Sequence, residues 1–126
     1  SLFTRALATR RAELGPTHPI VGYSIDDLGR LAYARGDTAA GIPFMLEAAE
    51  AMRGKNEPQR AIQYVMAARG AVSVGRPALV DSLVALVFGM DSAAALPPLT
   101  LAIAVEARGG AAAGRGDARA AEAAWL

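Results

Sequence analysis

The stretch ARGAVSVGR, residues 68–76, returns 39 residues later as ARGGAAAGR, residues 107–115, with Ala-Arg-Gly at the start and Gly-Arg at the end in step. Three residue types keep the same 39-residue spacing along the chain. They are the prolines Pro19, Pro58 and Pro97, the arginines Arg30, Arg69 and Arg108, and the glycines Gly36, Gly75 and Gly114. A fixed period of this length is typical of proteins built by stacking one supersecondary unit on copies of itself. The sequence therefore predicts a repeat architecture.

Each repeat carries residues that favour the start and the end of a helix. Proline suits the first turn of a helix, where its missing N–H has no partner to lose, and a glycine about 17 residues later can adopt the left-handed conformation that ends a helix. A second helical stretch follows each glycine. We expect seven helices, near residues 2–14, 19–35, 38–53, 58–74, 77–90, 97–113 and 117–126.

The composition favours an all-α fold. Alanine, the best helix former, occupies 30 of the 126 positions and lets helix axes approach closely. The one run that could be a buried strand, ALVDSLVALVFGM at residues 78–90, is longer than the usual strand and is better explained as a helix. Antiparallel helix pairs at this period predict an α-solenoid, in which neighbouring units stack to bury one continuous core.

Residues 27–50, DLGRLAYARGDTAAGIPFMLEAAE, resemble a tetratricopeptide repeat (TPR) in Leu28-Gly29, Tyr33 and the Gly36-Asp37 turn. Residues 5–19, RALATRRAELGPTHP, are similar to the linker of the kinesin-light-chain type of TPR, as found in bacterial proteins. The likeness covers residues 1–54 best, and residues 55–115 depart from it, for example at Gly75-Arg76. The resemblance implies a right-handed superhelix whose concave groove binds peptides.

The repeat divides the chain into units of about 1–15, 16–54, 55–93 and 94–126, the first of them partial. We expect a single TPR-like segment that forms part of a longer chain. Its uncapped ends would then leave apolar side chains partly exposed and able to self-associate. These side chains are Phe3, Leu7, Trp125 and Leu126.

Charge and residue types argue against several functions. The net charge of +1 does not favour a nucleic-acid or membrane-surface role, and no run reaches the ~20 apolar residues of a membrane span. There is no cysteine, and the single histidine, His18, lies beside Pro19, where we expect it to cap or pack a turn. We therefore expect no metal site, no cofactor and no catalytic activity, and a cytoplasmic location.

The helix predicted at residues 19–35 has two faces. Ile25, Leu28, Gly29 and Ala32 form the stripe expected to pack on the partner helix. The resemblance places the other face in the groove, with the 39-residue equivalents of Arg30 beside it. The predicted partner-contacting residues are Tyr23, Asp26, Asp27, Arg30, Tyr33, Val65, Met66, Arg69 and Arg108.

Arginine's planar guanidinium suits carboxylates, so the expected partner is a protein or peptide with acidic and apolar residues. Two other roles stay open for these side chains: arginines late in a helix often only solvate its end, and Asp26 or Asp27 can pair with Arg30 within one helix. The sequence thus predicts a non-catalytic protein-interaction module. The alternative is a regulatory helical segment of a larger signalling enzyme, such as a bacterial Ser/Thr kinase.

Overall fold

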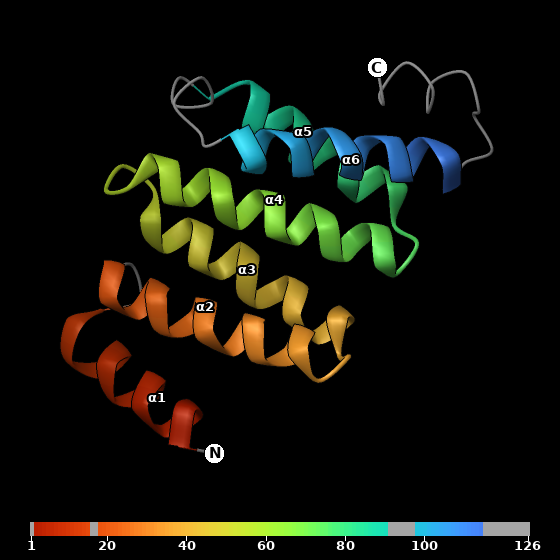
Figure 1. The fold of residues 1–126 in the computed structure, drawn as a ribbon. Coiled ribbons are helices and arrows are strands. Elements are labelled where there is room, and N and C mark those ends of the chain that lie inside the picture. Colours follow the sequence, from red (N-terminus) through yellow and green to blue (C-terminus); the bar gives the residue numbers. More distant parts are fainter. Residues whose placement is uncertain (1, 16–17, 91–97, 115–126) are drawn as a thin grey trace.

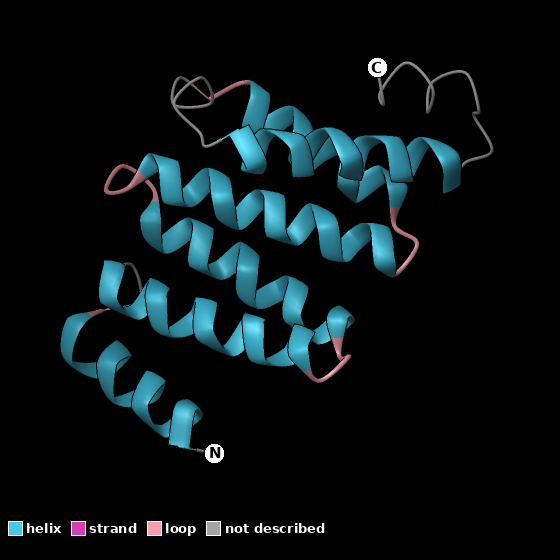
Figure 2. Ribbon diagram, viewed as in Figure 1, coloured by secondary structure: helices cyan, strands magenta, loops and turns pink. Residues whose placement is uncertain are grey.

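The computed structural model describes residues 2–15, 18–90 and 98–114, and this part of the chain consists of helices joined by turns (Figures 1 and 2). The helices are α1 (Leu2–Leu14), α2 (Pro19–Ala34), α3 (Thr38–Met52), α4 (Glu57–Ser73), α5 (Pro77–Phe88) and α6 (Pro98–Gly114). No strand occurs within these ranges, so the predicted all-α class is confirmed. The helix expected at residues 117–126, with Trp125 and Leu126, lies outside the described residues.

Local capping interactions explain where the helices begin and end. His18 accepts a hydrogen bond from the backbone N–H of Ile20 through Nδ1 (3.2 Å), which confirms the predicted cap. Asn56 does the same for α4 by accepting from the N–H of Gln59 (3.3 Å). At the turns after α2 and α4, Gly36 and Gly75 have φ of 81° and 71°, in the left-handed region that glycine adopts without steric cost.

Consecutive helices pack on one another from α1 to α5, and α6 packs on both α4 and α5. Figure 1 shows α1 to α4 as successive layers, with α5 and α6 closing the stack. The larger core lies among α3 to α6, and a smaller one joins α1, α2 and α3. Leu7 is 4% exposed and belongs to the smaller core with Val21 and Ile25, so the expectation that it is partly exposed was wrong.

Small residues allow α2 to lie close to α3. A Cβ atom at Gly22 would lie 2.7 Å from Cε of Met52, and one at Gly29 would lie 2.9 Å from Cε of Met45. Both methionines are fully buried. The predicted packing stripe of α2 is confirmed at Ile25 and Gly29, which are buried against this partner helix.

The side chain of Tyr33 connects three helices. Its ring lies against Gly41 of α3, and its hydroxyl lies against Gly70 of α4; a Cβ atom at either glycine would be 2.4 Å from the tyrosine. The hydroxyl donates a hydrogen bond to the carbonyl oxygen of Met66 (2.9 Å). This contact links α2 to α4, and part of the candidate site lies between these two helices.

Candidate functional site

Two small hollows lie next to each other on α4, and Arg69 and Ser73 line both of them. The α2–α4 hollow, of about 240 Å³, is lined by Tyr33, Thr38, Met66, Arg69, Gly70 and Ser73. The α4–α6 hollow, of about 250 Å³, is lined by Arg69, Val72, Ser73, Ile103, Glu106, Ala107 and Gly110. Each is large enough for about one side chain, so the pair forms a small, divided candidate surface for binding.

Arg69 is the cation of this surface. It is exposed, and within the described part of the chain its guanidinium makes no ion pair or hydrogen bond. Arg30, in contrast, pairs with Asp26 (Nε to Oδ2, 2.9 Å), and the guanidinium of Arg108 stacks 4.8 Å from the ring centre of Phe88. Among the described residues, Arg69 is the one arginine of this register whose guanidinium contacts neither a carboxylate nor an aromatic ring.

The wall on the α2 side comes from Tyr33 and Met66. Burial raises the pKa of Tyr33 to about 12, so its hydroxyl stays protonated at neutral pH and keeps donating to the Met66 carbonyl. That hydrogen bond holds the aromatic ring beside Arg69. The structure thus brings together three residues that the sequence predicted for the site, namely Tyr33, Met66 and Arg69.

The other predicted residues of α2 lie outside the two hollows. Asp26 is 7% exposed and pairs with Arg30, which confirms the ion pair within one helix that was left open as an alternative to partner contact. Its Oδ1 atom is buried without a hydrogen-bond partner among the described residues. Asp27 is exposed, and the hydroxyl of the exposed Tyr23 accepts a hydrogen bond from Nδ2 of Asn56 (3.1 Å).

Two of the predicted site residues are placed differently from expectation. Val65 is 2% exposed and lies in the larger core, because one residue before Met66 is a rotation of about 100° around α4. Arg108 faces Phe88 of α5, while the turns of α6 that line the α4–α6 hollow carry Ile103, Glu106 and Gly110. Arg108 therefore lies outside both hollows that Arg69 lines.

Sequence reasoning missed several residues of the site. Ser73, Thr38, Ile103 and Glu106 have no place in the 39-residue register of arginines. Ser73 follows Arg69 by one helical turn, a spacing that places both residues on one face of α4. In the structure the Ser73 hydroxyl donates to the Arg69 carbonyl oxygen (3.4 Å). The contribution of α6 depends on how that helix rotates against α4.

A larger hollow, of about 1050 Å³, lies on the other side of α4. Arg60 lines it, and the separation of nine positions between Arg60 and Arg69 amounts to two and a half turns of helix, so the two residues lie on opposite faces of α4. This α4–α5 hollow is lined by Arg53, Glu57, Arg60, Ser82, Ala85, Leu86, Gly89 and Met90. This hollow is larger than the two that Arg69 lines. Whether it could bind an anion depends on whether its charged side chains are already paired.

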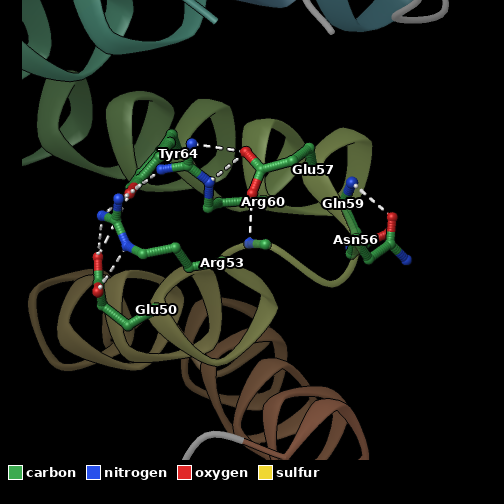
Figure 3. Close-up of polar contacts among 8 residues, drawn as sticks. Glu50, Arg53, Asn56, Glu57, Gln59, Arg60 and Tyr64 are labelled. Atoms are coloured by element: carbon green, nitrogen blue, oxygen red, sulfur yellow. Dashed lines mark hydrogen bonds and ion pairs between the residues drawn. The ribbon is translucent and has the colours of Figure 1, made fainter.

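Figure 3 shows that the charged groups at this hollow are already paired. Arg53 pairs with Glu50 (2.8 Å) and Arg60 with Glu57 (2.6 Å), while both guanidiniums also donate to the hydroxyl of Tyr64. The Arg53 hydrogen bond lowers the pKa of Glu50, and the Arg60 hydrogen bond lowers the pKa of Glu57. The cluster connects the two ends of the turn between α3 and α4 and leaves no uncompensated cation among the described residues that line this hollow.

Sequence reasoning overlooked this cluster, although part of it was visible. Glu57, Arg60 and Tyr64 follow one another at helical spacing, which predicts contacts along one face. The link to Arg53 and Glu50 needs the α3–α4 turn to fold back. The tertiary structure supplies that turn.

Within residues 2–15, 18–90 and 98–114, no group of three or more His, Cys, Asp or Glu side chains could hold a metal ion. No helix in the same ranges has the length and apolar character needed to cross a bilayer. No protein-family model matches the chain, and neither the curated proteins nor the solved structures include a match.

Proposed function

We propose that this chain is a protein-interaction module that binds an acidic residue of a partner protein at Arg69. The observation that carries the proposal is the guanidinium of Arg69, which has no partner among the described residues and lies between two hollows that are each the size of a side chain. A guanidinium offers five N–H donors in a planar fork that matches a carboxylate. No catalytic step is needed for such a site to act.

The architecture proposed for the module is a TPR-like solenoid with a 39-residue period. The spacing of prolines and glycines and the packing of successive helices support it. In that architecture the partner segment lies across α2, α4 and α6. If the chain belongs to a larger signalling enzyme, the partner segment would belong to a neighbouring domain, and Arg69 would bind it in the same way.

Replacing Arg69 by Ala tests the proposal. Once the partner covers Arg69 and removes it from water, a hydrogen bond to this charged group is worth roughly 1.5–3 kcal/mol, so a selected acidic peptide should bind Arg69→Ala about ten- to a hundredfold more weakly. Arg69→Lys should also weaken binding, because an ammonium cannot reproduce the bidentate contact. The affinity of peptides selected from an acidic and apolar library would be measured at two salt concentrations.

Arg5→Ala provides the matched control, because Arg5 is exposed on α1 and the substitution changes the net charge equally. It should leave the affinity unchanged. Equal binding by the wild type and Arg69→Ala would mean that Arg69 is only a solvent-exposed side chain near the end of α4. The proposed function would then be wrong.

A further inference from the structure

We infer that the partner segment is extended and carries an apolar, an acidic and a basic side chain at alternating positions, placed from α2 towards α6. This inference rests on the proposed function, because the acidic residue is the one that Arg69 binds. It adds the chemistry of the two flanking side chains, which follows from the unequal linings of the two hollows.

The α2–α4 hollow suits an apolar side chain. Apart from Arg69 at its edge, its lining carries no charged group. Tyr33 and Met66 supply an aromatic ring and a thioether, and the Tyr33 hydroxyl is already engaged by the Met66 carbonyl. An apolar side chain entering this hollow would replace water at these surfaces without leaving a charge unpaired.

The α4–α6 hollow suits a basic side chain. Glu106 is exposed and makes no ion pair or hydrogen bond within the described ranges, even though Arg69 lines the same hollow. Beside it, Val72 and Ile103 provide an apolar surface. A lysine or arginine can lay its aliphatic stem along such a surface and carry its charged head to a carboxylate.

The spacing of the helices sets the spacing of the three side chains. Packed helices lie about 8–10 Å apart, so the valleys on the two sides of α4 are separated by about that distance. In an extended chain, residues i, i+2 and i+4 point to one side and span about 13 Å. A segment that crosses α4 obliquely matches this span to valleys about 8–10 Å apart, so the outer two side chains can enter the two hollows while the middle one reaches Arg69 between them.

A charge exchange between site and peptide tests the inference. The probes are the acetylated and amidated pentapeptides Leu-Ser-Glu-Ser-Lys and Leu-Ser-Glu-Ser-Glu, each made in both chain directions and titrated by NMR. Wild type should prefer the lysine peptide by about two- to fivefold, the range of an exposed ion pair. Glu106→Lys should reverse that preference. Glu13→Lys, on α1, changes the net charge equally and should keep it.

The outcomes separate this inference from the proposed function. If Glu106→Lys keeps the wild-type preference while Arg69→Ala still weakens binding about ten- to a hundredfold, the basic position is wrong and the interaction at Arg69 stands. If the wild type binds neither peptide, or if Arg69→Ala binds both as tightly as the wild type, the two proposals fail together. The inference is supported if Glu106→Lys prefers the Leu-Ser-Glu-Ser-Glu peptide while the wild type and Glu13→Lys both prefer Leu-Ser-Glu-Ser-Lys.

Discussion

The hydroxyl of Tyr33 on α2 donates a 2.9 Å hydrogen bond to the carbonyl oxygen of Met66 on α4, although the two residues are 33 positions apart. The tyrosine passes between Gly41 and Gly70, so that α3 also takes part in the contact. Because Tyr33 and Met66 both line the α2–α4 hollow, one side chain contributes to the stability of the helix stack and to the shape of the candidate site.

Tyr33→Phe should destabilise the protein by about 1 kcal/mol, because it removes one intramolecular hydrogen bond and keeps the ring packing. Urea unfolding followed by far-UV circular dichroism would show the change as a lower midpoint with the same slope. Tyr23→Phe is the matched control, since the Tyr23 hydroxyl makes an exposed contact with Asn56 and its loss should cost less than ~0.5 kcal/mol. Equal losses in the two variants would contradict the assigned importance of the Met66 contact.

Alkaline pH should remove the advantage that wild type has over Tyr33→Phe. The pKa of Tyr33 is raised from 10.0 to about 12 in the folded protein, so between these values the unfolded chain loses this proton while the folded one keeps it. The stabilisation is therefore complete below pH 10 and is lost as the pH rises towards 12. Urea midpoints of both proteins from pH 8 to 12 would test this, and a constant difference over that range would refute it.

Gly70→Ala should destabilise the wild type by about 1–3 kcal/mol, because the added methyl group would lie 2.4 Å from the Tyr33 hydroxyl and force the side chain to move. In a Tyr33→Phe background this contact is absent, and the same substitution should cost less. A double-mutant cycle from four urea midpoints gives the coupling between the two positions. Additive effects would show that the Tyr33 hydroxyl does not occupy the space that a side chain at position 70 would need.

Acid should weaken the turn between α3 and α4. The hydrogen bond from Arg60, followed by that from the Gly54 N–H, lowers the pKa of Glu57 from 4.5, so its contribution is present above pH 4.5 and is lost as the pH falls through the folded value. Because the Glu57–Arg60 pair is partly exposed, the free energy of unfolding of the wild type should exceed that of Glu57→Gln by no more than ~1 kcal/mol near pH 6.

That gap should close below pH 4. Glu13→Gln, which alters an exposed carboxylate on α1, is the control and should show no comparable pH dependence. Urea midpoints at pH 3 to 6 provide the measurement. A gap between wild type and Glu57→Gln that is unchanged at pH 3 would rule out the ion pair as its source.

Six of the seven helices predicted from the sequence occur in the described residues, and most of their ends were predicted as well. Pro19 and Gly36 mark the limits of α2 to within two residues, and Gly75 separates α4 from α5 as predicted. These signals are local: proline lacks the N–H that a helix interior needs, and glycine reaches positive φ without strain. Pairing of Asp26 with Arg30 could also be predicted, because residues four apart share one face of a helix.

Tertiary packing distinguishes the three periodic arginines. Arg30, Arg69 and Arg108 are equivalent in the sequence, yet one pairs with Asp26, one stacks on Phe88 and one has no side-chain partner within the described residues. Likewise, Val65 and Met66 are neighbours in the chain, but only Met66 lines the site. The rotation of each helix about its axis is set by packing against two or more neighbours, and α6, which contacts both α4 and α5, brings Glu106 to the site and carries Arg108 away from it.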